Sequence, residues 1–292
     1  MSGAGRPLQS PSDKARARIL FSKPRNVKAR DALKKPKPGI MPLAARCLLL
    51  AALLTCLAGC GLVDLPLAAD VAPWQTVAPG LQVRTMQPHN DASAQLVIAR
   101  IDPEQYRFRA IYRPGAAQSL AAWQAQEPEA SLIVNANYFD SARRALGLVV
   151  SDGRAYGQAF RQRGGSFLVG EGEAAVVANH AGRQRPPSEQ AVQGYPLLVE
   201  NGEQAYANPR GGERNRRSVI AQDSQGRILI IVAPFLGPSL AQLSAYLAAA
   251  DLDIVTAFNL DGGRSTMLAI PAADYMLPSL QAVPTILAVY KR

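Results

Sequence analysis

Apolar residues recur in short runs along most of the chain, and these runs predict a fold rich in β-strands. In residues 106–112, Tyr106, Phe108, Ala110 and Tyr112 alternate with other side chains, as expected for a strand that buries one face. Continuous apolar runs, such as 132–134, are typical of more deeply buried strands. The predicted strands are 81–86, 95–99, 106–112, 132–134, 146–150, 217–222, 227–233, 254–258 and 285–290.

Turn and capping residues separate these runs. Asp152-Gly153 and residues 223–226 are typical of hairpin turns between strands. Ser119 predicts the N-cap of a helix over 119–126, and Pro238-Ser239 predicts the start of a second helix with leucines on one face. Many strands, few helices and no internal repeat predict an α+β fold, a single domain with mixed, strand-rich sheets and a few helices.

The first 60 residues differ from the rest in charge. The chain carries 32 Lys and Arg against 22 Asp and Glu, a net charge of +10, and 12 of these basic residues with only two acidic residues lie in 1–60. Residues 61–292 therefore hold 20 basic and 20 acidic side chains and are formally neutral. Because non-specific binding to nucleic acid requires a net basic face, we expect no nucleic-acid partner.

A basic flank, an uncharged apolar run and small residues before a cysteine together predict a lipoprotein signal peptide. Arg46 precedes the apolar run 47–58, which suits the core of a signal peptide and is short for a membrane span. The run leads into Leu57-Ala58-Gly59-Cys60, a lipobox in which the Cys60 thiol receives the lipid. We expect a lipid-anchored protein of the bacterial cell envelope, on the periplasmic face of the outer membrane.

The domain limits follow from these features. Residues 1–60 form the predicted signal peptide, of which 1–40 are Lys/Arg/Pro-rich and indicate an over-extended gene start or an unstructured leader. Residues 61–79, rich in Ala, Pro and Val, predict a tether, and 80–292 the folded domain.

Most familiar catalytic motifs are missing from the predicted domain. The three cysteines, Cys47, Cys56 and Cys60, all fall within the signal peptide, and His89 and His180 are the two histidines. The sequence therefore predicts no disulfide, no metal site and no cofactor, and it lacks an HExxH motif, a GxSxG elbow and a P-loop. Carboxylates, amides, hydroxyls and arginines remain as candidates for chemistry.

The first polar cluster is Asn135-Ala-Asn137-Tyr-Phe-Asp140, directly after the run 132–134. Amide and acidic side chains at the end of a fixed strand can form the wall of a polar site. The same residues suit Asx-turns equally well, so local sequence leaves both interpretations open.

The second cluster is Arg214-Asn-Arg216-Arg217-Ser218, at the entry to a strand. Guanidinium groups bind phosphate oxygens with two parallel hydrogen bonds. For Arg214 and Arg216 we favour a solvated basic loop.

The third cluster is Asn259-Leu-Asp261-Gly262-Gly263-Arg264-Ser265-Thr266, after the strand 254–258. The Gly-Gly step permits positive φ angles and a close approach of the backbone to a ligand. A tight Asp-Gly turn is the alternative.

In this order the clusters resemble the phosphodiester glycosidase family, over about residue 80 to the C-terminus. The family's segments correspond to 135–139, 147–153, 194–202, 217–227 and 259–266. The last of these is the most specific. Arg264 departs from the pattern, because many relatives have a third glycine there, and an arginine could add a phosphate contact or narrow the pocket.

The resemblance implies hydrolysis of a sugar-1-phosphodiester, which frees the sugar and leaves a phosphomonoester. A carboxylate near the sugar carbon, for which we choose Asp261, stabilises developing positive charge, and Arg217 holds the diester. Asn135 completes the predicted catalytic set. The predicted substrate-binding residues are Asn137, Ser218, Asn259, Gly262, Gly263, Arg264, Ser265 and Thr266.

Two other classes of protein remain open from the sequence. The first is a non-catalytic envelope lipoprotein that binds a phosphosugar or a glycan, and binding without turnover would distinguish it. The second is a structural lipoprotein that uses the three clusters only as turns, and indifference of every envelope phenotype to Asp261→Asn would favour it.

The lipobox generates the first testable prediction. The mature protein should begin at a lipidated Cys60 and fractionate with membranes, because the lipid supplies the anchor. Intact-mass measurement after membrane fractionation checks this, and Cys60→Ser should release an unlipidated protein. A wild-type periplasmic protein that keeps residues before Cys60 and carries no lipid would contradict the prediction.

Overall fold

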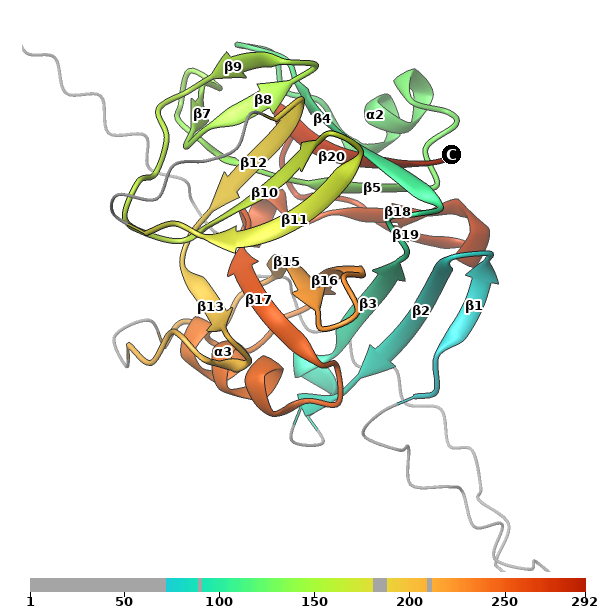
Figure 1. Ribbon diagram of the computed structural model, residues 1–292, viewed down its shortest axis with the longest axis vertical. Helices are drawn as coiled ribbons and strands as arrows, with labels where there is room; N and C mark the ends of the chain where they lie inside the picture. Colours follow the sequence, from blue (N-terminus) through green and yellow to red (C-terminus); the bar gives the residue numbers. More distant parts are fainter. Residues whose placement is uncertain (1–71, 89–90, 181–187, 209–211) are drawn as a thin grey trace, which may run out of the picture. The chain divides into compact units, whose positions relative to one another are not determined.

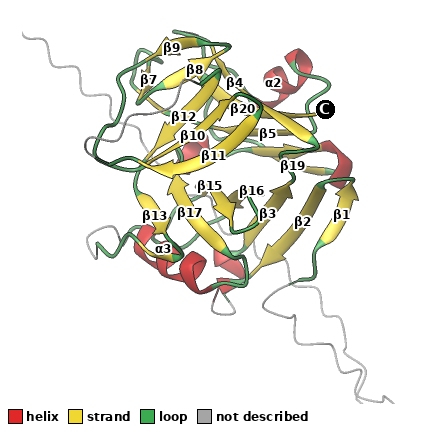
Figure 2. Cartoon of the chain, in the orientation of Figure 1, coloured by secondary structure: helices red, strands yellow, loops and turns green. Residues whose placement is uncertain are grey.

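Three large sheets and one small two-stranded sheet make up the computed structural model, which describes residues 72–88, 91–180, 188–208 and 212–292 (Figures 1 and 2). These residues belong to one compact unit, Asp64–Arg292. Cys60, the signal peptide and most of the predicted tether lie outside the described residues. In the described parts no helix is long and apolar enough to cross a membrane.

The largest sheet has eight strands, in the order β1-β2-β3-β16-β15-β17-β13-β14. Its members are β1 (Gln75–Ala78), β2 (Leu81–Met86), β3 (Leu96–Ile101), β13 (Leu197–Glu200), β14 (Glu203–Gln204), β15 (Arg217–Asp223), β16 (Ile228–Ala233) and β17 (Ile254–Asn259). Helix α3 (Leu240–Ala249) packs on one face of this sheet, where Leu243 and Leu247 join Val219 of β15 in a buried cluster. Ile220, the next residue along β15, belongs to the core on the opposite face.

Two five-stranded sheets lie beside the largest sheet (Figure 1). One has the order β19-β18-β5-β20-β4, with β4 (Tyr106–Tyr112), β5 (Leu132–Asn135), β18 (Leu268–Ile270), β19 (Tyr275–Leu277) and β20 (Thr285–Lys291). The other has the order β11-β10-β12-β8-β9, with β8 (Val149–Ser151), β9 (Arg154–Tyr156), β10 (Gly165–Gly170), β11 (Glu173–Ala178) and β12 (Gln190–Gly194). The small sheet pairs β6 (Tyr138–Phe139) with β7 (Ala145–Leu146).

The remaining elements are short helices. Helix α2 (Leu120–Gln126) buries Trp123, whose indole nitrogen donates to the carbonyl of Val283 at 3.2 Å. Three 3₁₀ turns are η2 (Ala92–Ala94), η4 (Gly263–Ser265) and η5 (Pro271–Ala273).

One apolar core joins the three large sheets. Val134 of β5, Phe167 of β10 and Phe258 of β17 are all fully buried members of the same cluster, and Phe108 of β4 packs edge-to-face against Phe167 at 5.2 Å. Burial of three aromatic rings supplies a large share of the apolar area that stabilises the fold. The strand ends that carry the polar clusters are fixed by this shared core.

The structure confirms the strand-rich fold with two α-helices. Ser119 and Ser239 cap α2 and α3 as predicted, and Ser239 forms a capping box with Gln242. The strands run antiparallel in every pair within the described residues, so the expected mixture of parallel and antiparallel pairs is wrong.

Two boundaries also need correction. Strand β1 occupies 75–78, at the end of the predicted tether, because Trp74 packs against the sheet and Arg100 lies 3.8 Å from its ring centroid. The predicted strand 146–150 is divided into β7 and β8, because Gly147 between them has a φ of +85°.

Gly194 at the end of β12 gives a prediction about stability. A Cβ atom there would lie 2.1 Å from the carbonyl oxygen of Asn259 and 2.9 Å from the ring of Phe258. Gly194→Ala should therefore lower the free energy of unfolding by about 3 kcal/mol, because two buried backbones must separate. Denaturant unfolding measures the loss.

Gly226→Ala is the control for Gly194→Ala. Gly226 has a φ of +79° but no atom within 4 Å of the added Cβ, so it tests backbone strain without a clash. Its loss should be about 1 kcal/mol. Equal losses for the two variants would show that the close approach of β12 to Asn259 is unimportant.

Candidate functional site

The three predicted polar clusters converge where β5, β15 and β17 end or begin. Three backbone hydrogen bonds hold the segment that follows β17: Leu260 N donates to Ser218 O at 2.8 Å, Asp261 N to Ala136 O at 2.9 Å, and Gly263 N to Arg216 O at 2.8 Å. The segment therefore lies between the residue after β5 and the first residues of β15. Clusters more than 40 residues apart in the sequence form one site.

Asn135 is the centre of this junction. Its Oδ1 accepts from the Ser218 hydroxyl at 2.8 Å and from Met267 N at 3.0 Å, and its Nδ2 donates to Asp261 O at 2.6 Å. The side chain is buried and these bonds engage both amide atoms. Asn135 and Ser218 therefore hold the Asp261 loop in place from behind.

The carboxyl group of Asp261 is held by its own loop. Its Oδ1 accepts from Gly262 N at 2.9 Å, and the Ser265 hydroxyl is a second hydrogen-bond partner. Gln281 Nε2 donates to Ser265 Oγ at 2.7 Å, which leaves the Ser265 proton for the carboxyl group. Burial raises the pKa of Asp261 from 3.8 to about 6, although both hydrogen bonds oppose this rise.

Tyr138 is a site residue that the sequence prediction missed. Its hydroxyl accepts from Asn259 Nδ2 at 2.6 Å and donates to Tyr195 O at 2.6 Å. Burial raises the pKa of Tyr138, and the charge of Asp261 raises it further, whereas the hydrogen bond from Asn259 and the charge of Arg217 lower it. The Tyr138 hydroxyl is thus near both predicted catalytic charges.

Arg217, the first residue of β15, forms no direct ion pair among the described residues, although the charge of Glu213 acts on it. Its Nε donates to Pro238 O at 3.3 Å and its Nη2 to Glu213 O at 2.5 Å. Partial burial lowers the pKa of Arg217. Two neutral carbonyls orient the guanidinium and leave its charge available for an anion.

The Gly-Gly step explains how the Asp261 loop reaches β15. A Cβ atom at Gly262 would lie 3.0 Å from Arg216 O and 3.8 Å from Arg217 Cα, and Gly263 has a φ of +61°. The backbones of the two predicted catalytic segments are therefore in contact, a closeness that a larger residue at 262 would disturb. Asp261 and Arg217 therefore lie on adjacent backbone segments.

Among the other predicted site residues, two are buried in the protein and one is exposed on its surface. Asn137 is buried and donates to the carbonyls of Leu146 and Leu148, at 3.4 and 3.1 Å. Thr266 is also buried. Arg264 is exposed and donates to Leu280 O at 3.3 Å, on the outer side of the loop.

One of the two arginines assigned to a solvated loop is instead structural. Arg216 is buried and its Nη2 donates to Thr266 O at 2.8 Å and Pro278 O at 2.9 Å. Arg214 pairs with Asp91 at 2.7 Å. Arg214 is exposed, as expected, whereas the interpretation was wrong for Arg216, whose long-range contacts with carbonyl groups are not revealed by its charge alone.

Tyr138 could have been suspected from its place in the sequence. It stands between Asn137 and Phe139 within the first polar cluster, where an aromatic residue with a polar tip follows two amides. In the part of the chain that is described, no three His, Cys, Asp or Glu side chains are grouped as metal ligands would be.

Comparisons with known proteins find solved structures of similar fold. The zebrafish N-acetylglucosamine-1-phosphodiester alpha-N-acetylglucosaminidase catalytic domain, auto-inhibited by its pro-peptide, matches with a TM-score of 0.56 and 17% identity, over 76% of this chain and 82% of that one. A hypothetical protein from Synechocystis matches with a TM-score of 0.52 and 17% identity, over 77% and 65% of the two chains. At such identities the likeness concerns the fold. No curated protein matches the sequence.

The phosphodiester glycosidase family model matches residues 128–290, which is more than half of the chain and includes all three polar clusters. The chain therefore belongs to the phosphodiester glycosidase family.

Proposed function

We propose that this protein hydrolyses sugar-1-phosphodiesters. Water adds its oxygen to the anomeric carbon, the bond from that carbon to the phosphate oxygen breaks, and a sugar and a phosphomonoester remain. The observation that carries the proposal is the hydrogen bond from Gly263 N, in the Asp261 loop, to Arg216 O at the start of β15, together with Tyr138, on which the charges of both Asp261 and Arg217 act. A carboxylate and a guanidinium on neighbouring segments suit the two charged parts of the substrate.

Each group has a distinct task in this reaction. The ionised Asp261 carboxylate stabilises positive charge that develops on the sugar carbon. The Arg217 guanidinium binds the negatively charged phosphate of the diester, and it remains bound to that phosphate while the bond to the sugar carbon breaks. Asn259 holds the Tyr138 hydroxyl, and Asn135 with Ser218 fixes the loop, so that reorganisation during the reaction is small.

We also propose that the enzyme acts from the periplasmic face of the outer membrane, anchored through Cys60. This part of the proposal is supported by the lipobox and by the neutral charge balance of residues 61–292. The substrate would then be a phosphosugar or a glycan of the cell envelope.

A panel of sugar-1-phosphodiesters tests the proposal. Incubation with the purified full-length protein should release free sugar and a phosphomonoester from at least one member. Saturable binding of such a compound with no turnover would favour a glycan-binding lipoprotein instead.

Asp261 gives a prediction with a defined pH dependence. The ionised form is needed and the pKa lies at about 6, so kcat/KM should fall as the pH drops through about 6. Asp261→Asn should lower kcat by about a hundredfold or more, because the charge is lost while size and most hydrogen bonds remain. Activity that persists in Asp261→Asn with an unchanged pH profile would contradict this role.

Arg217 should chiefly govern binding of the diester. Arg217→Ala should raise KM by about tenfold or more, and Arg217→Lys should restore only part of the loss, because an ammonium lacks the planar fork. Steady-state kinetics measures both variants. Arg113→Ala, an exposed arginine at the end of β4, is the control and should leave KM unchanged. Full rescue by Arg217→Lys would argue against bidentate binding.

A further inference from the structure

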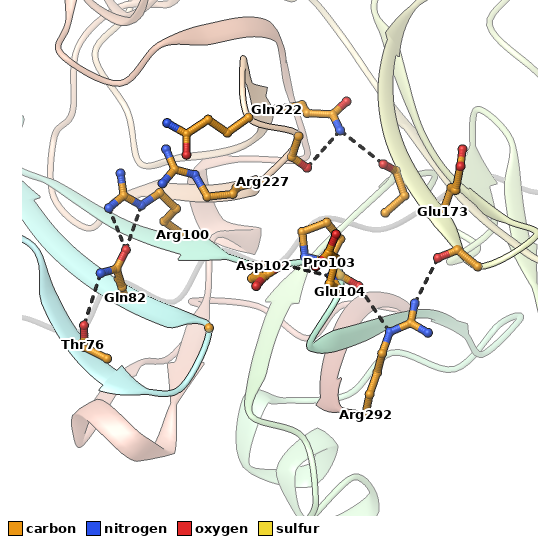
Figure 3. A pocket seen from close by; sticks show the side chains of 15 residues that line it. Thr76, Gln82, Arg100, Asp102, Pro103, Glu104, Glu173, Gln222, Arg227 and Arg292 are labelled. Carbon is orange, nitrogen blue, oxygen red and sulfur yellow. Dashed lines mark hydrogen bonds between the residues drawn. The ribbon is translucent and has the colours of Figure 1, made fainter.

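A cavity of about 940 Å³ lies at the opposite end of β15 from Asp261 and is lined by neither Asp261 nor Arg217 (Figure 3). It is bounded by β2, the end of β3, the β15–β16 turn and the β10–β11 turn. Gln222 on its wall is five residues along β15 from Arg217, a separation of about 17 Å at the usual rise per residue. The cavity is therefore separate from the proposed reaction site.

Two guanidinium groups on one wall are held in fixed positions. Gln82 Oε1 accepts from both Nε and Nη2 of Arg100, at 3.0 and 2.6 Å, while the Arg100 guanidinium stacks on Trp74. Arg227 Nε donates to Asp223 Oδ2 at 2.6 Å, and the Asp223 side chain is fully buried. Such groups lose little conformational entropy when a ligand binds.

This wall carries one positive charge in excess. Burial lowers the pKa of Arg100, and the nearby charge of Arg227 lowers it further. Asp223 neutralises one of these two positive charges. Arg84 and Asp251 form an ion pair at 3.8 Å and together add no net charge. One negative charge placed between Arg100 and Arg227 would balance the wall.

The lining of the cavity also holds three acidic side chains, Asp102, Glu104 and Glu173, and a third arginine, Arg292. Asp102 already accepts from Glu104 N at 2.9 Å and from Gln105 Nε2 at 2.7 Å. Glu104 and Glu173 are exposed at the rim, where water screens their charges. An acidic ligand would meet both signs of charge, and its anionic group would bind at the fixed guanidinium groups of Arg100 and Arg227.

The rest of the lining suits hydroxyl groups more than apolar surface. Gln222 spans the wall, with Nε2 donating to Ala174 O and Gly226 O at 3.2 and 3.1 Å, and Gln225 stands exposed beside it. The described residues that line the cavity include no aromatic side chain and no leucine, isoleucine or valine. Its volume is in the range of sites for small ligands. A polar molecule rich in hydroxyls fits this lining.

We propose that the cavity is a second binding site, for an acidic saccharide whose carboxylate binds Arg100 and Arg227 and whose hydroxyls bind the surrounding amides. A carboxylate is favoured over a phosphomonoester because its single charge matches the excess of one, and its planar shape matches the guanidinium fork. This site would hold the protein on an acidic glycan, and it does not depend on the proposed hydrolysis.

Calorimetric titration of the full-length protein tests the proposal, with tetragalacturonate as the acidic probe and maltotetraose as the neutral one. Gln82→Glu is the informative variant, because a carboxylate at 82 can still accept from Arg100 while it cancels the charge of that arginine. Gln126→Glu adds the same charge at an exposed position of helix α2 that does not line the cavity, and it is the matched control. Asp261→Asn separates this site from the proposed reaction site.

Wild-type protein should bind tetragalacturonate at least tenfold more tightly than maltotetraose. Gln82→Glu should weaken that binding about tenfold or more, whereas Gln126→Glu and Asp261→Asn should change it less than twofold. Arg100→Gln, checked for an unchanged unfolding temperature, should repeat the loss. Long-chain polygalacturonate should bind more tightly than the tetramer if the natural source is a polymer, and equally if it is a free oligosaccharide.

Three results would overturn the proposal. The first is equal affinity for the acidic and the neutral probe, and the second is undiminished binding by Gln82→Glu. The third is loss of binding in Asp261→Asn alone, which would place the saccharide at the proposed reaction site. The first two results do not bear on whether the protein hydrolyses phosphodiesters, which the release of free sugar tests separately.

Discussion

The buried amide of Asn135 is the interaction on which the candidate site depends. It joins the end of β5 to Ser218 of β15, to the backbone of Asp261 and to Met267, partners that are 83, 126 and 132 residues away in the sequence. Loss of one partner would leave buried donors or acceptors unpaired, at a cost of about 1–3 kcal/mol each. Because the amide is satisfied by protein groups, the loop that carries Asp261 has one defined position.

That fixed loop explains the electrostatics of the site. Asp261 lies where burial opposes its charge, and only two neutral donors, Gly262 N and the Ser265 hydroxyl, support the ionised form. A closer salt bridge would lower the pKa and weaken the attraction of the carboxylate for a cationic transition state. Arg217 is instead oriented by carbonyls and keeps its charge for a ligand. The fold joins the backbone segments that carry the two opposite charges, and no direct ion pair between Asp261 and Arg217 forms among the described residues.

Local sequence patterns predicted nine strands and the two helices α2 and α3, because capping and alternation act over a few residues, but they missed β10 to β14, β18 and β19. Ser119 and Ser239 marked helix starts, and the alternation of 106–112 marked β4. Patterns of that range predicted the two hairpins β8–β9 and β15–β16, but they contain no information on pairs between distant strands, so the order of the sheets and the early strand β1 were not predicted. The same limit explains Arg216, whose burial depends on carbonyls at Thr266 and Pro278, at least 50 residues away.

The candidate site residues were predicted from motifs, but their tasks were set by long-range contacts. Asn135 and Ser218 were expected to touch substrate, and their hydrogen bonds instead support the loop. Tyr138 was passed over, since its importance comes from Asn259 and the carbonyl of Tyr195 across the site. A polar residue in a motif thus indicates that a site is near, whereas only tertiary contacts separate the groups that face a ligand from those that hold them.

Strand β15 connects two regions of positive charge that act independently. Arg217 stands at its first residue and Arg227 just beyond its last, across the turn to β16. A separation of about 17 Å along the strand exceeds the Debye length of about 8 Å at physiological ionic strength, so charges at one end are largely screened from the other. Substitutions at the two ends should therefore combine additively, as expected for sites without shared partners. The strand is also buried on both faces, which makes it a rigid spacer. A saccharide held at one end would leave the geometry of Asp261 and Arg217 at the other unchanged.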